Sequence, residues 1–155
     1  MKTDSLQWAA TMQPLVRKIE ELFLEDLRRF ASELRQQFPA LMFNVWKWPS
    51  DTVKECTDFD LGIECRFPEV VEGNPDNVAL IIELCFLNST PRIMGSVVWG
   101  HPSGHPEAEF SHSHVTNAEW PEAKPEKIEE LRGFFPTLVQ SFKAAVERGI
   151  PTDAA

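Results

Sequence analysis

An alternating segment in the middle of the chain places the strongest constraint on the fold. From Asp58 to Phe67, apolar side chains alternate with polar ones, which is typical of an antiparallel strand with one buried face. The segment from Val78 to Leu87 is apolar on both faces apart from Glu83, so it belongs in the centre of a sheet. A sheet of this kind needs a second layer of structure to cover its apolar face.

Helical patterns at both ends of the chain can supply this layer. The first helix is expected from Pro14 to Gln37, because proline suits the first turn of a helix and apolar residues then recur at steps of three and four. The second helix is expected from Pro125 to Arg148, with Gly149 as its C-cap. Pro136 removes a hydrogen bond within this helix, which predicts that the helix kinks or divides there.

The remaining apolar segments predict three more strands, at Leu41–Trp48, Arg92–Trp99 and Ala108–Thr116. The sequence therefore predicts an α+β fold with a long N-terminal helix, a five-stranded antiparallel meander and a kinked C-terminal helix, the helices packed on one sheet face. A length of 155 residues suits one domain. We expect this single domain to span residues 1–155, with an ordered core from about residue 14 to about residue 149.

The turn between the second and third strands sets an expected register for the sheet. A symmetric turn places Phe67 opposite Val78, and opposed residues share a face. The apolar face then belongs to the core, and Cys65 and Cys85 fall on opposite faces, which argues against a disulfide between them. The other face combines acidic and apolar residues, namely Asp58, Asp60, Glu64, Ile81, Glu83, Cys85 and Leu87.

Composition excludes several classes of function. The chain has 15 basic and 24 acidic residues and a formal net charge of −9, which argues against binding to nucleic acid or to an anionic membrane. The longest apolar run falls short of the roughly 20 residues of a membrane span, and polar residues interrupt the N-terminus where a signal peptide needs an apolar stretch. Three cysteines do not make a disulfide scaffold. We therefore expect a cytoplasmic protein.

The sequence lacks the common nucleotide-binding and hydrolase motifs, but its four histidines lie close together at His101, His105, His112 and His114. His112 and His114 lie about 7 Å apart on one strand face, which suits two ligands of one metal ion. The other two belong to the preceding turn, about 13 Å along the strand from His112. With no third ligand opposite, we expect neither a metal site nor a cofactor.

Two functional hypotheses from different classes remain. The favoured one is a non-catalytic interaction module (adaptor, chaperone-like or immunity-like) that binds a protein, either a basic partner or a second copy in a homodimer. Its predicted contact residues are Trp46, Trp48, Ile81, Leu87, Asp58, Asp60 and Glu64, because aromatic residues are enriched at interfaces. The alternative is a small-ligand binder or hydrolase-like enzyme with a pocket between the sheet and the C-terminal helix. Its predicted lining is Trp99, Phe110, His112 and His114.

Overall fold

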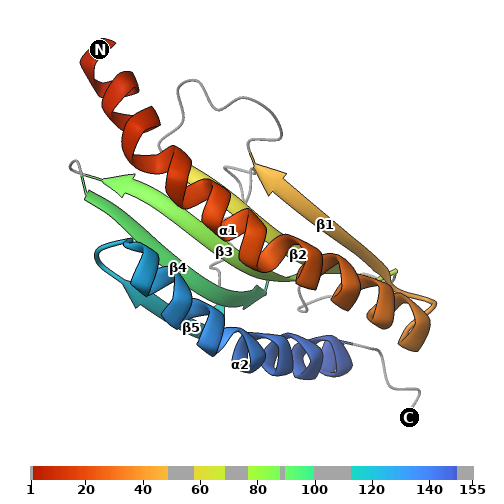
Figure 1. Ribbon diagram of the computed structural model, residues 1–155. Helices are drawn as coiled ribbons and strands as arrows, with labels where there is room; N and C mark the ends of the chain where they lie inside the picture. The colour runs from red at the N-terminus through yellow and green to blue at the C-terminus, as the bar shows by residue number, and fades with distance from the viewer. Residues whose placement is uncertain (1, 49–57, 69–76, 88–89, 100–112, 150–155) are drawn as a thin grey trace.

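Five antiparallel strands form one sheet in the order β1-β2-β3-β4-β5, and two helices cover one of its faces (Figure 1). The computed structural model describes residues 2–48, 58–68, 77–87, 90–99 and 113–149. The elements are α1 (Lys2–Gln37), β1 (Met42–Trp48), β2 (Asp58–Arg66), β3 (Asn77–Leu87), β4 (Thr90–Trp99), β5 (Ser113–Trp120) and α2 (Pro125–Gly149). The α+β fold expected from the sequence is confirmed.

The core lies between the sheet and the helices. α1 packs over β1, β2 and β3, while α2 packs over β3, β4 and β5. The alternating residues of β2 from Phe59 to Cys65 and their partners on β3 are buried on this side, as the periodicity predicted. The largest side chains that are almost fully buried are Phe23, Phe59, Phe142, Met12, Ile19, Leu27, Leu34, Leu61, Ile63, Leu80, Ile82 and Leu84.

The two helices also contact each other above the sheet. The rings of Phe23 and Phe135 lie 5.4 Å apart between centroids, and Lys18 and Glu129 form an ion pair at 3.0 Å. On the sheet side, Gly95 allows α2 to approach closely. A Cβ added at Gly95 would lie 2.6 Å from Cδ1 of Leu131, so a larger residue would force the helix side chains to move.

α1 begins twelve residues earlier than the expected start at Pro14. Proline fixes a φ value that a helix accepts and costs one backbone hydrogen bond. Met12, Leu15 and Val16 are all buried against the sheet or α2. Because these side chains extend the apolar stripe across Pro14, packing can offset the lost hydrogen bond.

The last strand also differs from its expected position at Ala108–Thr116. β5 runs from Ser113 to Trp120, and residues 108–112 lie outside the described part. Trp120, which was expected to follow the strand, pairs with Ile93 and packs against the core. α2 is one helix through Pro136, and Figure 1 shows it bending along its length rather than dividing in two.

Candidate functional site

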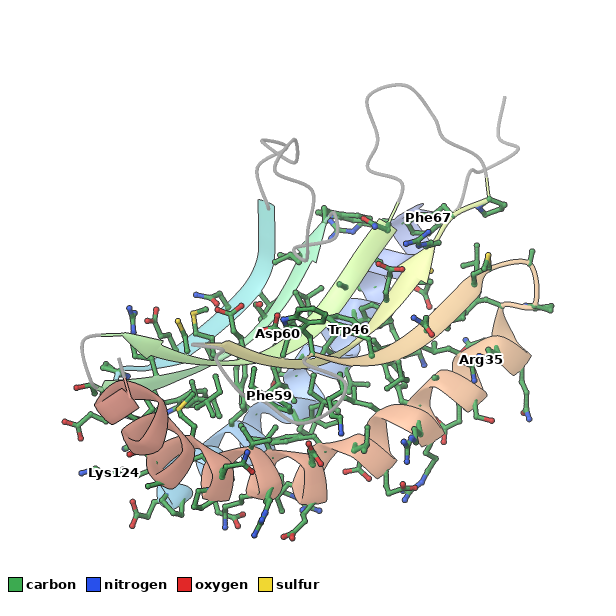
Figure 2. All side chains as sticks on the ribbon, turned by 90° about the horizontal axis from the view of Figure 1, so that it is seen from above. Arg35, Trp46, Phe59, Asp60, Phe67 and Lys124 are labelled. Carbon is green, nitrogen blue, oxygen red and sulfur yellow. The ribbon has the colours of Figure 1, made fainter. Side chains whose placement is uncertain are left out.

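The face of the sheet turned away from the helices carries the residues that the sequence singled out for partner binding. We call this the outer face, with Trp46, Ile81 and Ser96 at its centre. Figure 2 shows Trp46 and Asp60 on this side of the sheet and Phe59 on the opposite side, toward the helices. One row of paired positions crosses all five strands at Trp46, Gly62, Ile81, Ser96 and Asn117.

A small apolar cluster occupies the centre of the outer face. Ala79, Ile81 and Val98 are 0%, 3% and 2% exposed and form a cluster separate from the main core. The side chain of Trp46 reaches this cluster from β1, which β2 separates from β3. The outer face is therefore not a plain solvent face, because it has an apolar centre of its own.

Gly62 leaves room for the indole of Trp46 on the outer face. It pairs with Trp46 across β1 and β2. A Cβ added at Gly62 would lie 2.5 Å from Cη2 and 2.9 Å from Cζ2 of the indole, and closer still to the backbone oxygen of Leu80. The indole thus lies across the glycine and reaches the apolar cluster beyond it, an arrangement in which an aromatic residue covers a strand glycine.

Acidic residues border this apolar centre on one side. Asp60 and Glu83 pair directly across β2 and β3, and both are partly buried. The same row continues to Met94 and Glu119, and Glu119 forms an ion pair with Arg92. Within the described residues, no group of three or more histidine, cysteine, aspartate or glutamate side chains could hold a metal ion.

A buried ion pair lies on the other side of the apolar centre. Glu64 is 3% exposed, and its Oε1 accepts a hydrogen bond of 2.7 Å from Nε of Arg66. The Arg66 side chain is 64% exposed, so the pair joins a buried carboxylate to a solvated guanidinium. Of the acidic residues predicted for partner binding, Glu64 is therefore engaged within the fold, while Asp58 begins β2 and its side chain is not described.

The exposed large apolar side chains of the described residues both belong to β1. Met42 is 70% exposed and Trp48 is 55% exposed. They alternate with buried Phe43 and partly buried Val45, which places them on the outer face with Trp46. Trp46 and Trp48 were predicted as contact residues and Met42 was not, although the same alternation includes it. Leu87 lies at the end of β3, opposite Thr90, and its side chain is not described.

Trp99 and the backbone of His114 are the parts of the alternative ligand pocket that lie within the described residues. Trp99 lies on the helix side, 6.4 Å from the Phe67 ring and 5.8 Å from the Arg148 guanidinium. His114 pairs with Val98, whose side chain belongs to the outer cluster. A shift in register between Val97 and Val98 produces this arrangement. Phe110, His112, His101 and His105 lie outside the described residues.

Burial governs the chemistry of the Cys65 thiol. Cys65 is fully buried on the helix side of β2, and burial raises the pKa of its thiol from 9.0 to about 12. A thiol with so high a pKa is protonated at neutral pH and is a poor nucleophile. Cys65 and Cys85 are both thiols rather than halves of a disulfide, and they lie on opposite faces as predicted.

Comparison of the chain with protein-family models, curated proteins and solved structures finds no match in any of the three. In the described part of the chain, neither helix has the length and apolar character needed to cross a membrane. We therefore infer a function from the geometry of the outer face.

Proposed function

We propose that this protein is a non-catalytic interaction module that binds a protein partner through the β1 side of its outer face. The observation that supports this proposal most directly is the pair of exposed apolar side chains, Met42 and Trp48, on a strand at the edge of the sheet. Tryptophan is enriched among the residues that dominate binding energy at protein interfaces. Their exposure on an edge strand makes both residues candidates for contact with a partner.

Contacts on both faces of β1 support these two residues, and a strand that is already held in place loses less entropy on binding. Trp46 lies between them in the sequence, and its side chain packs against Ala79, Ile81 and Val98. On the helix side, Lys47 forms an ion pair with Glu20 at 3.5 Å, and Arg35 donates a 2.8 Å hydrogen bond to the carbonyl oxygen of Phe43. These contacts hold β1 against α1 while its outer side remains available to a partner.

We assign this module to a reducing compartment such as the cytoplasm. The state of two cysteines favours the assignment. Cys65 and Cys85 are thiols on opposite faces of the sheet, and a protein of oxidising compartments would more often use its cysteines in disulfides. The net charge of −9 also disfavours nucleic acid as the partner.

A site-specific photo-cross-linker tests the proposal in the native host. The side chain of Trp48 is replaced by p-benzoylphenylalanine, which keeps an aromatic group at this position, and Gln140 on the exposed side of α2 receives the same replacement as a control. We expect protein adducts after irradiation at position 48 and none at position 140. No adduct at position 48, or equal adducts at both positions, would exclude β1 as the binding surface.

A further inference from the structure

β1 lies at an edge of the sheet, and its sequence offers little resistance to pairing with another strand. Within the described residues it pairs with β2 along one side, and the other side of an edge strand presents backbone donors and acceptors to a new strand. Its single charged residue is Lys47, which is already in an ion pair with Glu20 of α1. No repulsive charge within β1 therefore opposes a second strand of the same sequence.

The two exposed apolar residues stand at opposite ends of this strand. Met42 is its first residue and Trp48 is its last, so their Cα atoms lie about 20 Å apart at roughly 3.3 Å per residue. A single side chain from a partner could not cover both. An antiparallel partner strand with an apolar residue at each end could cover both at once.

We propose that the partner strand is β1 of a second copy, paired antiparallel about a two-fold axis at Val45. This inference rests on the proposed function, because it uses the same exposed side chains of the outer face. In this register Met42 lies opposite Trp48 of the other copy, and the reverse pair forms by symmetry. Asn44 then lies opposite Trp46, and the two five-stranded sheets form one continuous sheet.

Full pairing and mutual covering select the same register, because Met42 and Trp48 are the first and last residues of β1. Pairing all seven residues of β1 with all seven of the second copy requires Val45 at the centre. Placing Met42 of one copy opposite Trp48 of the other also requires Val45 at the centre. This register brings the Met42 thioether against the Trp48 indole, which is a favourable contact. Any other antiparallel register leaves an end of the strand unpaired. It also separates Met42 of one copy from Trp48 of the other.

The size and charge of this interface predict its strength. One pair of strands about 23 Å long buries much less than the roughly 1,600 Å² of a standard interface, so the dimer should be weak and concentration-dependent. Each copy carries a net charge of −9, and like charges repel at low ionic strength. Added salt should therefore strengthen self-association, whereas it would weaken binding to a basic partner.

Sedimentation velocity of the full chain tests the pairing, over concentrations from about 5 to about 500 μM. Wild type should show a reversible monomer–dimer equilibrium that shifts toward dimer with added salt. Trp48→Glu alone and Met42→Lys alone should each weaken the dimer at least about tenfold. The double variant should recover most of the loss, because each new lysine then faces a new glutamate of the other copy. Gln140→Ala, on the exposed side of α2, does not change the net charge and should leave the equilibrium unchanged.

Each outcome decides the proposal. A wild type that stays monomeric throughout, or single variants that dimerise normally, would overturn pairing through β1. Loss in both single variants without recovery in the double variant would overturn the register centred on Val45. Circular dichroism and urea unfolding of each variant show whether it is folded, which the high exposure of both side chains leads us to expect. Adducts at position 48 with a different protein, combined with a monomeric wild type, would overturn self-pairing while the interaction module stands.

Discussion

Replacing Gly62 with alanine should destabilise the fold more than any other glycine-to-alanine change that the structure lets us assess. The added methyl group would lie 2.5 Å from the Trp46 indole and closer still to the backbone oxygen of Leu80. The indole is the end of a side chain and can rotate away, although it would then leave the cluster of Ala79, Ile81 and Val98. The Leu80 carbonyl belongs to the central strand and can move only if β2 and β3 separate locally.

The magnitude follows from this second contact. Inserting a methyl group into a well-packed site typically costs about 1–3 kcal/mol. Alanine gains up to about 1 kcal/mol over glycine in a strand because it restricts the unfolded chain. Since the backbone of β3 cannot relax without disturbing its pairing with β2, we expect a steric cost near the upper end of the range, about 3 kcal/mol. Subtracting the gain of about 1 kcal/mol from alanine leaves a net loss of about 2 kcal/mol in the free energy of unfolding.

Urea unfolding, followed by tryptophan fluorescence and by circular dichroism, measures this change. The matched control is Gly133→Ala. Gly133 lies within α2 with no atom within 4 Å of an added Cβ, so alanine there should stabilise the protein by about 0.5–1 kcal/mol. Adding Trp46→Leu to Gly62→Ala should relieve the contact with the indole and leave the one with Leu80. A Gly62→Ala protein as stable as wild type would refute the steric argument.

Three further predictions concern the core and the outer cluster. Ile82→Ala should cost about 2–5 kcal/mol in urea unfolding, because Ile82 is fully buried on the central strand; a loss below about 1 kcal/mol would contradict tight packing there. Trp46→Glu should cost about 2 kcal/mol or more, because it places a carboxylate against Ala79 and Ile81; unchanged stability would show that the indole contributes little. Cys65 should resist alkylation at pH 8 until the chain unfolds, and rapid alkylation of the native protein would contradict its burial. Because its pKa is raised in the folded state, the folded protein binds more protons than the unfolded chain between about pH 9 and pH 12, so the free energy of unfolding should fall as the pH rises through this interval.

The faces of the sheet were predictable from sequence even though the register was not. The symmetric turn placed Phe67 opposite Val78, whereas Cys65 occupies that position in the structure. The offset is two residues, and side chains alternate with a period of two, so every side chain stays on its expected face. An offset of one residue would have moved the whole apolar set to the outer face, which explains why alternation predicts faces more reliably than partners.

The two errors in element position have a common physical origin. Local signals predict a first helix that begins at Pro14 and a fifth strand that ends at Thr116, before Trp120. Tertiary packing decided otherwise, through the burial of Met12 and Leu15 and through the pairing of Trp120 with Ile93. Local sequence patterns do not predict these contacts, because the partner residues lie on other elements.

The candidate site could be predicted in part. Alternation placed Trp46 and Trp48 on one face, yet it could not say that Trp46 would be partly buried and Trp48 exposed. That difference arises because Gly62 lies opposite Trp46 and leaves room for its indole, whereas Asp60 lies opposite Trp48. The pairing of β1 with β2 depends on a connection whose geometry the sequence pattern does not fix.

The contact between α1 and α2 has a consequence for how the protein folds and unfolds. Every strand of the meander pairs with its neighbour in sequence, so the sheet can form through the closure of short loops. The contact between Phe23 and Phe135 instead closes most of the chain into one loop, at a larger entropic cost. We expect contacts of this kind to form late, so that weakening them mainly accelerates unfolding. The meander should then govern how quickly the native state forms, and the helix pair should govern how long it lasts.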